Sequence, residues 1–237
     1  MTIIIVVTLE HSYFYNMELN AYIDHTLLHP TASESEIIQL CQEAISYKFY
    51  AVCVNSCHVP LAVKTLKDSN VKVCSVVGFP LGAASTNAKA VEAKHAVAQG
   101  ANEIDMVLNI GWLKSMEYNK VWKDIESVKN SIPNTVVKVI LETCYLEDKE
   151  IIKASELAIQ CGAEFIKTST GFGTGGATIH VVKLMLSVAK NSTTKVKASG
   201  GIRDYATAKK YIDLGVERLG VSSGIAIIKG EKSDTGY

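Results

Sequence analysis

The sequence predicts a single (β/α)8 barrel, and three observations support this fold class. Eight short runs rich in β-branched and apolar residues alternate with longer stretches of helical periodicity, the pattern of parallel strands joined by crossover helices. The chain has 237 residues, and barrels of about 250 residues routinely form one domain. No proline-rich or Ser/Gly-rich linker divides the sequence. An open doubly wound sheet is the alternative, but eight strands favour closure into a barrel.

The expected strands follow one another at intervals that leave room for a helix after each. We place them at Ala21–Asp24, Tyr50–Asn55, Val71–Val77, Glu103–Asn109, Val136–Glu142, Glu164–Ser169, Lys195–Ser199 and Arg218–Ser222. Amphipathic segments between them predict helices at Glu36–Tyr47, Ala88–Ala98, Lys149–Gln160 and Ala206–Leu214. A Ser-x-x-Glu capping box, Ser33 to Glu36, predicts the start of the first helix.

One local pattern recurs at the junction of helix and strand. A glycine is followed by alanine or valine, then by one or two polar residues and an apolar strand, at Gly100, Gly162 and Gly215. Each glycine can supply the left-handed residue that ends a helix and turns the chain back to the sheet. The repetition favours a barrel of similar units over an assembly of unlike domains.

Composition and charge exclude several classes of protein. Hydrophobic residues make up 48% of the chain and charged residues 20%, which is the balance of a compact enzyme rather than of a disordered or fibrous chain. Lys plus Arg and Asp plus Glu both number 24, and no basic block is present. We therefore expect neither nucleic acid nor a membrane as a partner, and any anion-binding site must be local.

The termini and the cysteines bear on location. The apolar run Ile3–Val7 is too short to span a bilayer and lacks the basic flank and cleavage site of a signal peptide. Six cysteines without a Cys-x-x-Cys pair indicate reduced thiols, so we expect a cytoplasmic protein. Residues 1–16 are interpreted as an N-terminal extension, 17–230 as the barrel and 231–237 as a mobile polar tail.

Three polar residues interrupt apolar strands of the expected barrel. Lys167 follows Phe165 and Ile166, Lys197 lies in the next strand, and Asp105 lies in the fourth. Active sites of this fold form at the carboxyl ends of the strands. A lone lysine in a strand is usually a solvated end residue. Two lysines on neighbouring strands, with a carboxylate in the same barrel, instead indicate an active site.

This combination favours catalysis by an amine nucleophile. A lysine attacks a carbonyl only in its neutral form, and the reference pKa of a lysine is about 10.4. Burial in an apolar barrel and a second ammonium nearby both favour the neutral amine. We expect Lys167 to be the nucleophile and Lys197 the second ammonium. Asp105 would hold Lys197 in place, and these two would relay protons to and from the substrate.

Glycine-rich turns follow the last three strands, at 170–176, Gly200-Gly201 and 220–224. Late loops with bare backbone N–H groups are where this fold binds phosphate, which predicts a phosphorylated substrate. The alternative is that the glycines only permit tight turns. The first segment also matches G-x-G-x-x-G, but it follows a late strand and has no acidic residue about 20 positions on, so a dinucleotide site is not expected.

The sequence gives little support for a metal site or for a nucleophilic cysteine. His25 and His29 are four residues apart, but Thr26 replaces the Glu of a zinc-binding H-E-x-x-H helix and Pro30 follows. We interpret this stretch as a loop after the first strand and expect no metal ligand. Cys53, at the end of the second strand, is expected to line the pocket rather than to act as a nucleophile.

Eight motifs in order along the chain resemble those of the deoxyribose-phosphate aldolase family, from about Leu19 to Gly224. They are Asp24–Leu28 (DHTLL), Val52–Asn55 (VCVN), Val77–Gly82 (VGFPLG), Glu103–Val107 (EIDMV), Lys138–Thr143 (KVILET), Phe165–Gly171 (FIKTSTG), Lys197–Arg203 (KASGGIR) and Gly220–Ser223 (GVSS). Residues 1–16 have no counterpart in the family pattern, and the stretch after Gly224 is short. The resemblance implies a class I aldolase on a (β/α)8 barrel that needs no cofactor and no metal.

The resemblance also implies roles for individual residues. Lys167 would form the Schiff base, with Lys197 as second lysine and Asp105 as acid/base partner. The substrate would contact Asp24, Thr26, Cys53, Asn55 and Thr170, and its phosphate would bind at Gly171, Gly200, Gly201, Gly220, Ser222 and Ser223. Members of the family often end in a tyrosine that reaches the active site, so Tyr237 is a candidate proton donor to the enamine carbon.

The implied reaction is reversible cleavage of 2-deoxy-D-ribose 5-phosphate to D-glyceraldehyde 3-phosphate and acetaldehyde. Two alternatives remain open: another Schiff-base barrel, such as a transaldolase, and a barrel that only binds a phosphosugar. The expected partner is a small phosphosugar, and we expect a homo-oligomer, a dimer or tetramer.

Overall fold

A computed structural model describes residues 19–232 of the chain. In this part, eight parallel strands form a closed barrel in the order of the sequence, which confirms the predicted fold class. The strands are β1 (Ile23–Leu27), β2 (Ala51–Val54), β3 (Lys72–Val77), β4 (Glu103–Val107), β5 (Val136–Ile140), β6 (Phe165–Lys167), β7 (Lys195–Ser199) and β8 (Arg218–Val221). Strand β8 pairs with β1 and closes the ring.

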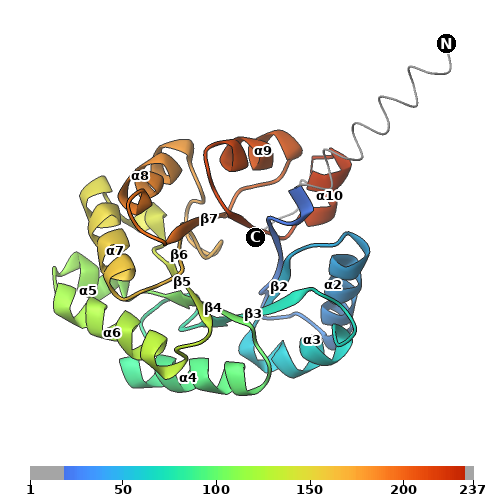
Figure 1. Ribbon diagram of the computed structural model, residues 1–237, viewed down its shortest axis with the longest axis horizontal. Coiled ribbons are helices and arrows are strands. Elements are labelled where there is room, and N and C mark those ends of the chain that lie inside the picture. Colours follow the sequence, from blue (N-terminus) through green and yellow to red (C-terminus); the bar gives the residue numbers. More distant parts are fainter. Residues whose placement is uncertain (1–18, 233–237) are drawn as a thin grey trace, which may run out of the picture.

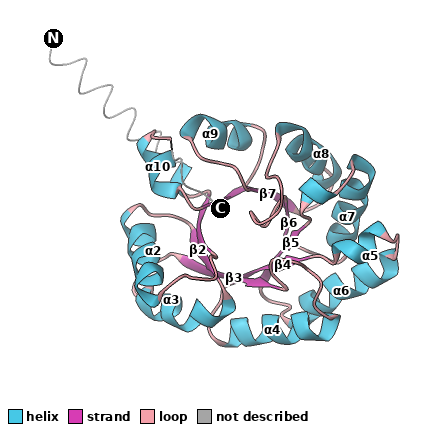
Figure 2. Ribbon diagram, turned by 180° about the vertical axis from the view of Figure 1, so that it is seen from behind, coloured by secondary structure: helices cyan, strands magenta, loops and turns pink. Residues whose placement is uncertain are grey.

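Helices surround the strands on the outside, as both views along the barrel show (Figures 1 and 2). They are α2 (Glu34–Ser46), α3 (Val59–Thr65), α4 (Thr86–Ala98), α5 (Ile110–Lys114), α6 (Tyr118–Ser131), α7 (Asp148–Gln160), α8 (Ile179–Ala189), α9 (Tyr205–Asp213) and α10 (Gly224–Lys229). Two short 3₁₀ helices, η1 (Ser56–His58) and η2 (Thr143–Tyr145), follow β2 and β5. No helix in residues 19–232 combines the length and apolar character needed to cross a bilayer.

Local sequence signals account for how these elements begin and end. The predicted capping box is present, since the Ser33 hydroxyl accepts from the Glu36 N–H and the Glu36 carboxylate accepts from the Ser33 N–H. Gly100, Gly162 and Gly215 all have positive φ, at 106°, 75° and 104°. Only glycine adopts such a conformation without strain, so each of the three repeated junctions works as predicted.

The first strand differs from the prediction. It spans Ile23–Leu27 rather than Ala21–Asp24, whereas the other seven strands lie within two residues of their predicted bounds. His25 is therefore part of a strand and not of a loop. Its side chain is buried, and its Nε2 lies 2.8 Å from Glu43 Oε2 on α2. This contact with the covering helix lets a polar residue occupy the strand.

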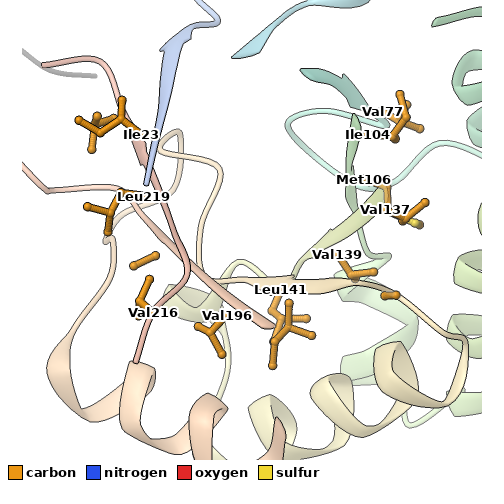
Figure 3. Packing of buried hydrophobic residues seen from close by; sticks show 14 of the residues in the cluster. Ile23, Val77, Ile104, Met106, Val137, Val139, Leu141, Val196, Val216 and Leu219 are labelled. Atoms are coloured by element: carbon orange, nitrogen blue, oxygen red, sulfur yellow. The ribbon is translucent and has the colours of Figure 1, made fainter. Parts of the chain in front are cut away.

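The main hydrophobic core lies between the strands and the helices. Alternate strand residues point outward into it, for example Ile104 and Met106 of β4 and Val137 and Val139 of β5 (Figure 3). All four are fully buried. Side chains alternate along a strand, so the residues between them face the barrel interior.

The barrel interior is polar in its centre. A small apolar cluster of Leu28, Cys53, Cys74 and Val76 occupies one side. Buried charged side chains fill much of the rest, from the strands at Asp24, Glu103, Asp105, Lys138, Lys167, Lys197 and Arg218. Burying a charge is costly unless it is paired, so the pairing of these groups decides whether the cluster is stable.

Candidate active site

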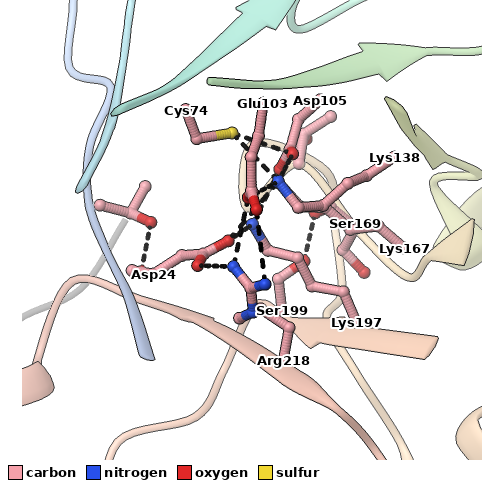
Figure 4. A network of polar contacts seen from close by, with 12 residues as sticks. Asp24, Cys74, Glu103, Asp105, Lys138, Lys167, Ser169, Lys197, Ser199 and Arg218 are labelled. Atoms are coloured by element: carbon pink, nitrogen blue, oxygen red, sulfur yellow. Dashed lines mark hydrogen bonds and ion pairs between the residues drawn. The ribbon is translucent and has the colours of Figure 1, made fainter. Parts of the chain in front are cut away.

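Three of the four predicted catalytic residues, Asp105, Lys167 and Lys197, meet inside the barrel (Figure 4). Asp105 Oδ2 lies 2.8 Å from Lys167 Nζ and 2.8 Å from Lys197 Nζ. Strand pairing brings this about, because Lys167 lies opposite Lys197 in the register of β6 and β7. Asp105 reaches both lysine nitrogens from β4 across the interior. A carboxylate shared by two lysines can hold their amines at fixed positions and exchange protons with either.

A third lysine completes the surroundings of Asp105. Lys138 of β5 is fully buried, and its Nζ lies 2.8 Å from Asp105 Oδ1 and 2.6 Å from Glu103 Oε2. Sequence reasoning did not select Lys138 or Glu103. Lys138 interrupts an apolar strand between Val137 and Val139, as Lys197 does between Val196 and Ala198, but the sequence does not show which face of the strand it lies on.

Asp24 and Arg218 close the cluster on its other side. Asp24 Oδ2 accepts a hydrogen bond from Lys197 Nζ, and Asp24 Oδ1 lies 2.8 Å from Arg218 Nη1. Arg218 Nη1 also lies 3.2 Å from Glu103 Oε2. The guanidinium carbon stands 3.4 Å from the centre of the Tyr50 ring, a cation–π contact. The contacts thus form a ring from Asp105 through Lys138, Glu103, Arg218 and Asp24 to Lys197.

The charges in this ring fix most of its protonation states. Burial opposes the ionised form of Asp24, but Lys197, Arg218 and Lys138 outweigh it and lower the pKa of Asp24 to about 2. Burial is likewise outweighed at Asp105, whose pKa is held well below its usual range by Lys138, Lys167 and Lys197. Both carboxylates therefore stay ionised at neutral pH.

The lysines of the ring respond in the opposite direction. Burial disfavours the ammonium form of Lys197, but Asp105 and Asp24 raise the pKa of this lysine. Burial is also overcome at Lys138, whose pKa Asp105 and other anions raise well above its usual value. Lys197 and Lys138 thus remain charged, as does Arg218.

A pocket lies at the carboxyl ends of the last strands. Lys167, only 2% exposed, lies at its edge and connects it with the buried cluster. The lining residues are Thr26, Lys167, Thr170, Gly171, Ser199, Gly200, Gly201, Ile202, Arg203, Gly220, Val221 and Ser222. The three glycine-rich turns therefore converge on one pocket. Arg203, a cation beside these turns, was not selected from the sequence.

Five of the six residues predicted to bind phosphate lie in this pocket. Gly171, Gly200, Gly201, Gly220 and Ser222 line the pocket. Ser223 does not, and stands directly before α10. Gly171, Gly200 and Gly201 have positive φ, at 92°, 84° and 77°, a conformation that favours glycine and directs backbone N–H groups into a concave surface.

The residues predicted to contact substrate divide into two groups. Thr26 and Thr170 line the pocket. Asp24 and Cys53 are fully buried in the barrel interior and are not among the lining residues. The Asn55 side chain donates to the Leu28 carbonyl at 3.2 Å, after the end of β2. Tyr237, residues 1–16 and the end of the tail from residue 233 lie outside the described residues.

Within residues 19–232, one group of side chains brings three metal-ligand atoms close together: Cys53, Cys74 and Asp105, all within 4.8 Å of one another. The geometry is explained without an ion. Cys74 Sγ donates to Asp105 Oδ1 at 3.0 Å, and Lys138 Nζ donates to Cys74 Sγ at 3.3 Å. Burial raises the pKa of the Cys74 thiol well above its usual value, so it stays protonated. All six cysteines lie in the described part of the chain and are free.

Comparison with known proteins identifies similar chains over nearly the whole described region. A family model described as DeoC/LacD family aldolase matches residues 19–230. The deoxyribose-phosphate aldolase of Carboxydothermus hydrogenoformans is 55% identical over 91% of this chain and 96% of its own. That of Finegoldia magna is 53% identical over 90% of this chain and 100% of its own.

Solved structures agree with the sequence comparison. A crystal structure described as a putative deoxyribose-phosphate aldolase from Coccidioides immitis superposes with a TM-score of 0.89 and 43% identity, over 90% of this chain and 85% of that one. The tetrameric deoxyribose phosphate aldolase of Aeropyrum pernix gives a TM-score of 0.84 and 32% identity, over 92% and 94%. A dihydrodipicolinate synthase of Bacillus anthracis, at 12% identity over 88% and 72% with a TM-score of 0.64, shares the fold alone.

Proposed function

The chain belongs to the DeoC/LacD aldolase family, and we propose that it cleaves 2-deoxy-D-ribose 5-phosphate through a Schiff base on Lys167. The products of this reversible reaction are D-glyceraldehyde 3-phosphate and acetaldehyde. The observation that carries the proposal is the position of Asp105, whose Oδ2 lies 2.8 Å from both Lys167 Nζ and Lys197 Nζ. A nucleophilic amine, a second ammonium and a carboxylate meet at the edge of a pocket.

The first step requires the neutral amine of Lys167. Among the described residues, the buried ring together with Lys167 holds four basic side chains, Lys138, Lys167, Lys197 and Arg218, and three carboxylates, Asp24, Glu103 and Asp105. Without a proton on Lys167 the ring holds three cations and three anions. A buried cluster is costly when it carries net charge, and the cluster is balanced in the state in which the Lys167 amine attacks. Its lone pair attacks C1 of the open-chain sugar. The carbinolamine hydroxyl then leaves as water with a proton relayed by the Lys197/Asp105 pair, and a protonated imine remains.

Cleavage of the C2–C3 bond follows. The C3 hydroxyl loses its proton to Asp105, with Lys197 as the charged partner that holds this carboxylate in place. The electron pair of the C2–C3 bond moves toward the iminium nitrogen, which releases D-glyceraldehyde 3-phosphate and leaves an enamine on Lys167. The protonated imine is the electron sink, so this chemistry requires no metal.

Protonation of the enamine carbon and hydrolysis by water then release acetaldehyde and the free lysine. Tyr237 remains a proposed proton donor for the carbon, and the Lys197/Asp105 pair is the alternative source. The phosphate of the substrate is proposed to bind the glycine-rich turns at Gly171, Gly200 and Gly201. Backbone N–H groups and the cationic Arg203 suit an anion in this place.

Two measurements test the proposal. Turnover of 2-deoxyribose 5-phosphate, followed by reduction of the triose product with NADH and coupling enzymes, should be readily detected. Borohydride added with acetaldehyde should inactivate the protein and leave an ethyl group on Lys167. Ethylation that persists in Lys167→Ala would disprove the assignment of the nucleophile, and absence of turnover would disprove the reaction. Turnover of a ketose instead would indicate another Schiff-base aldolase.

The proposal extends to assembly and location. The Aeropyrum pernix relative is described as tetrameric, and we propose a dimer or tetramer for this chain in the cytoplasm. Light scattering of the purified protein coupled to size-exclusion chromatography measures the number of chains directly. A monomer at micromolar concentration would contradict the proposed assembly.

A further inference from the structure

Glu142 is a buried carboxylate that stands outside the charged ring. It follows the end of β5, is only 2% exposed, and has φ 55° and ψ 62°. A left-handed conformation is rare for a residue with a side chain and indicates a local constraint. Within residues 19–232 no cation lies within ion-pair distance of its carboxylate. Its hydrogen bonds must therefore compensate for its burial.

Two of its hydrogen bonds come from the first turn of the loop after β6, and a third comes from Cys144 Sγ at 3.9 Å. Glu142 Oε1 accepts from the Thr170 N–H at 3.2 Å, and Glu142 Oε2 accepts from the Thr170 hydroxyl. Thr170 Oγ1 in turn accepts from the Phe172 N–H at 3.0 Å. The single hydroxyl proton of Thr170 is thus directed to Glu142. Gly171, whose backbone faces the pocket, is held between the two bonded residues.

The same loop packs closely on its supports at two further points. A Cβ on Gly173 would lie 2.6 Å from Cys144 Sγ and 3.2 Å from Glu142 Cδ, so the loop lies directly on the segment after β5. At its far end a Cβ on Gly176 would lie 2.3 Å from the Gly200 carbonyl oxygen. Segments after β5 and β7 therefore hold the loop from both sides.

We propose that Glu142 is a positioning residue that sets the phosphate-binding conformation of this loop through Thr170. The inference rests on the proposed function of the pocket. Glu142 itself does not line the pocket. By accepting both the N–H and the hydroxyl of Thr170, its carboxylate fixes the turn at Gly171 and so the direction of the N–H groups that follow. The buried carboxylate is expected to affect recognition of phosphate far more than the chemistry at Lys167.

Steady-state kinetics with a phosphorylated and an unphosphorylated sugar test this role. A glutamine at position 142 keeps the shape and one acceptor oxygen, but its NH₂ group cannot accept the Thr170 hydroxyl proton. Glu142→Gln should raise KM for 2-deoxyribose 5-phosphate by about tenfold, the scale of a hydrogen bond to a charged group. kcat/KM for unphosphorylated 2-deoxyribose should fall much less. An equal fall in kcat/KM for the two sugars, or an unchanged KM for 2-deoxyribose 5-phosphate, would overturn the proposal.

Two further variants show whether the effect passes through Thr170. Thr170→Val removes the hydroxyl and keeps the shape, and it should raise the same KM. The double variant should be no worse than the more affected single variant, because the two residues act as one unit. Additive losses would contradict the mechanism. Glu142→Gly replaces Glu142→Gln if the latter does not fold, since glycine adopts the left-handed conformation freely.

A control and a direct binding measurement separate this inference from the proposed function. Glu150→Gln also removes a charged acceptor, from Lys114 and the Glu147 N–H on α7, and should leave KM unchanged. Calorimetric titration with inorganic phosphate should show weaker binding to Glu142→Gln than to the unaltered protein. Equal phosphate affinity of the two would overturn the role of Glu142. Weaker binding in a protein without turnover would refute the reaction and leave that role supported.

Discussion

Lys138→Met perturbs the charge balance of the ring without touching the pocket. Lys138 is fully buried between Asp105 and Glu103 and is not among the pocket-lining residues. Its loss leaves three carboxylates with Lys167, Lys197 and Arg218. The ring is then neutral only when Lys167 is protonated, so the amine form needed for imine formation becomes less favourable.

The size of the effect follows from the geometry. Lys138 and Lys167 each lie 2.8 Å from a different oxygen of Asp105. For charges roughly 6 Å apart and an effective dielectric constant of about 20, the interaction is worth about 3 kcal/mol, or about 2 pH units. Removing the positive charge favours the ammonium of Lys167. The acid limb of the pH profile of kcat/KM should therefore move to higher pH by about 2 units. At pH values below this limb, kcat/KM should be about 10²-fold lower than in the unaltered protein.

The assay is the pH dependence of kcat/KM from pH 5 to 10, with Lys89→Met as the matched control. Lys89 is also fully buried, and its Nζ lies 2.6 Å from Asp124 Oδ2, outside the barrel. Both variants break a buried ion pair and should lose about 3–5 kcal/mol of unfolding free energy. Only Lys138→Met should shift the acid limb. An unshifted limb with the same loss of stability would refute the charge-balance reasoning.

Four further predictions follow from the site. Lys197→Leu should lower kcat by about 10²-fold or more while retaining the native circular dichroism spectrum; near-normal turnover would make Lys197 structural only. Exhaustive chelation should leave activity intact, and a loss restored by zinc would indicate the metal-dependent mechanism. The pKa of Asp24 is about 2 in the folded protein and about 3.9 in the unfolded chain. This difference should add about 2–3 kcal/mol to the free energy of unfolding above pH 4, and the contribution is lost as the pH falls through 2. Urea unfolding at a series of pH values should show this fall in stability, and an equal fall in Asp24→Asn would contradict the prediction. Deletion of Tyr237 should slow exchange of the acetaldehyde methyl protons with solvent more than it weakens binding of the phosphate ester; unchanged exchange would assign the proton to the Lys197/Asp105 side.

Much of the fold could be predicted because local signals and the global pattern agree. The periodicity of the apolar residues, the helix-capping motif and the glycines with left-handed backbone all indicate the same alternation of strands and helices. The first strand was misplaced because His25 and Thr26 are polar within it. The partner of His25 is distant in sequence, the carboxylate of Glu43, 18 residues away, whereas the Thr26 hydroxyl donates to the nearby Asp24 carbonyl.

The candidate site could be predicted only in part, for a reason specific to barrels. Both faces of a barrel strand are buried, so a polar residue such as Lys138 cannot be assigned to the interior without knowledge of strand pairing. The register Asp105 to Lys138 supplies that knowledge. The sequence also does not show how deep in the barrel a side chain lies. Cys53 and Thr26 are partners in the register of β1 and β2, yet only Thr26 lines the pocket. The bond from Thr170 to Glu142 spans 28 residues and has no local signal.

The buried ring has a consequence for how the chain folds. Asp24 bonds Lys197 and Arg218, which are 173 and 194 residues further along the chain. These contacts arise only when the last strand meets the first. A barrel that closed without these contacts would hold unpaired charges away from water, which is strongly unfavourable. Intermediates with an open seam should therefore be sparsely populated, late contacts should dominate the slow approach to the native state, and the barrel should unfold as one cooperative unit.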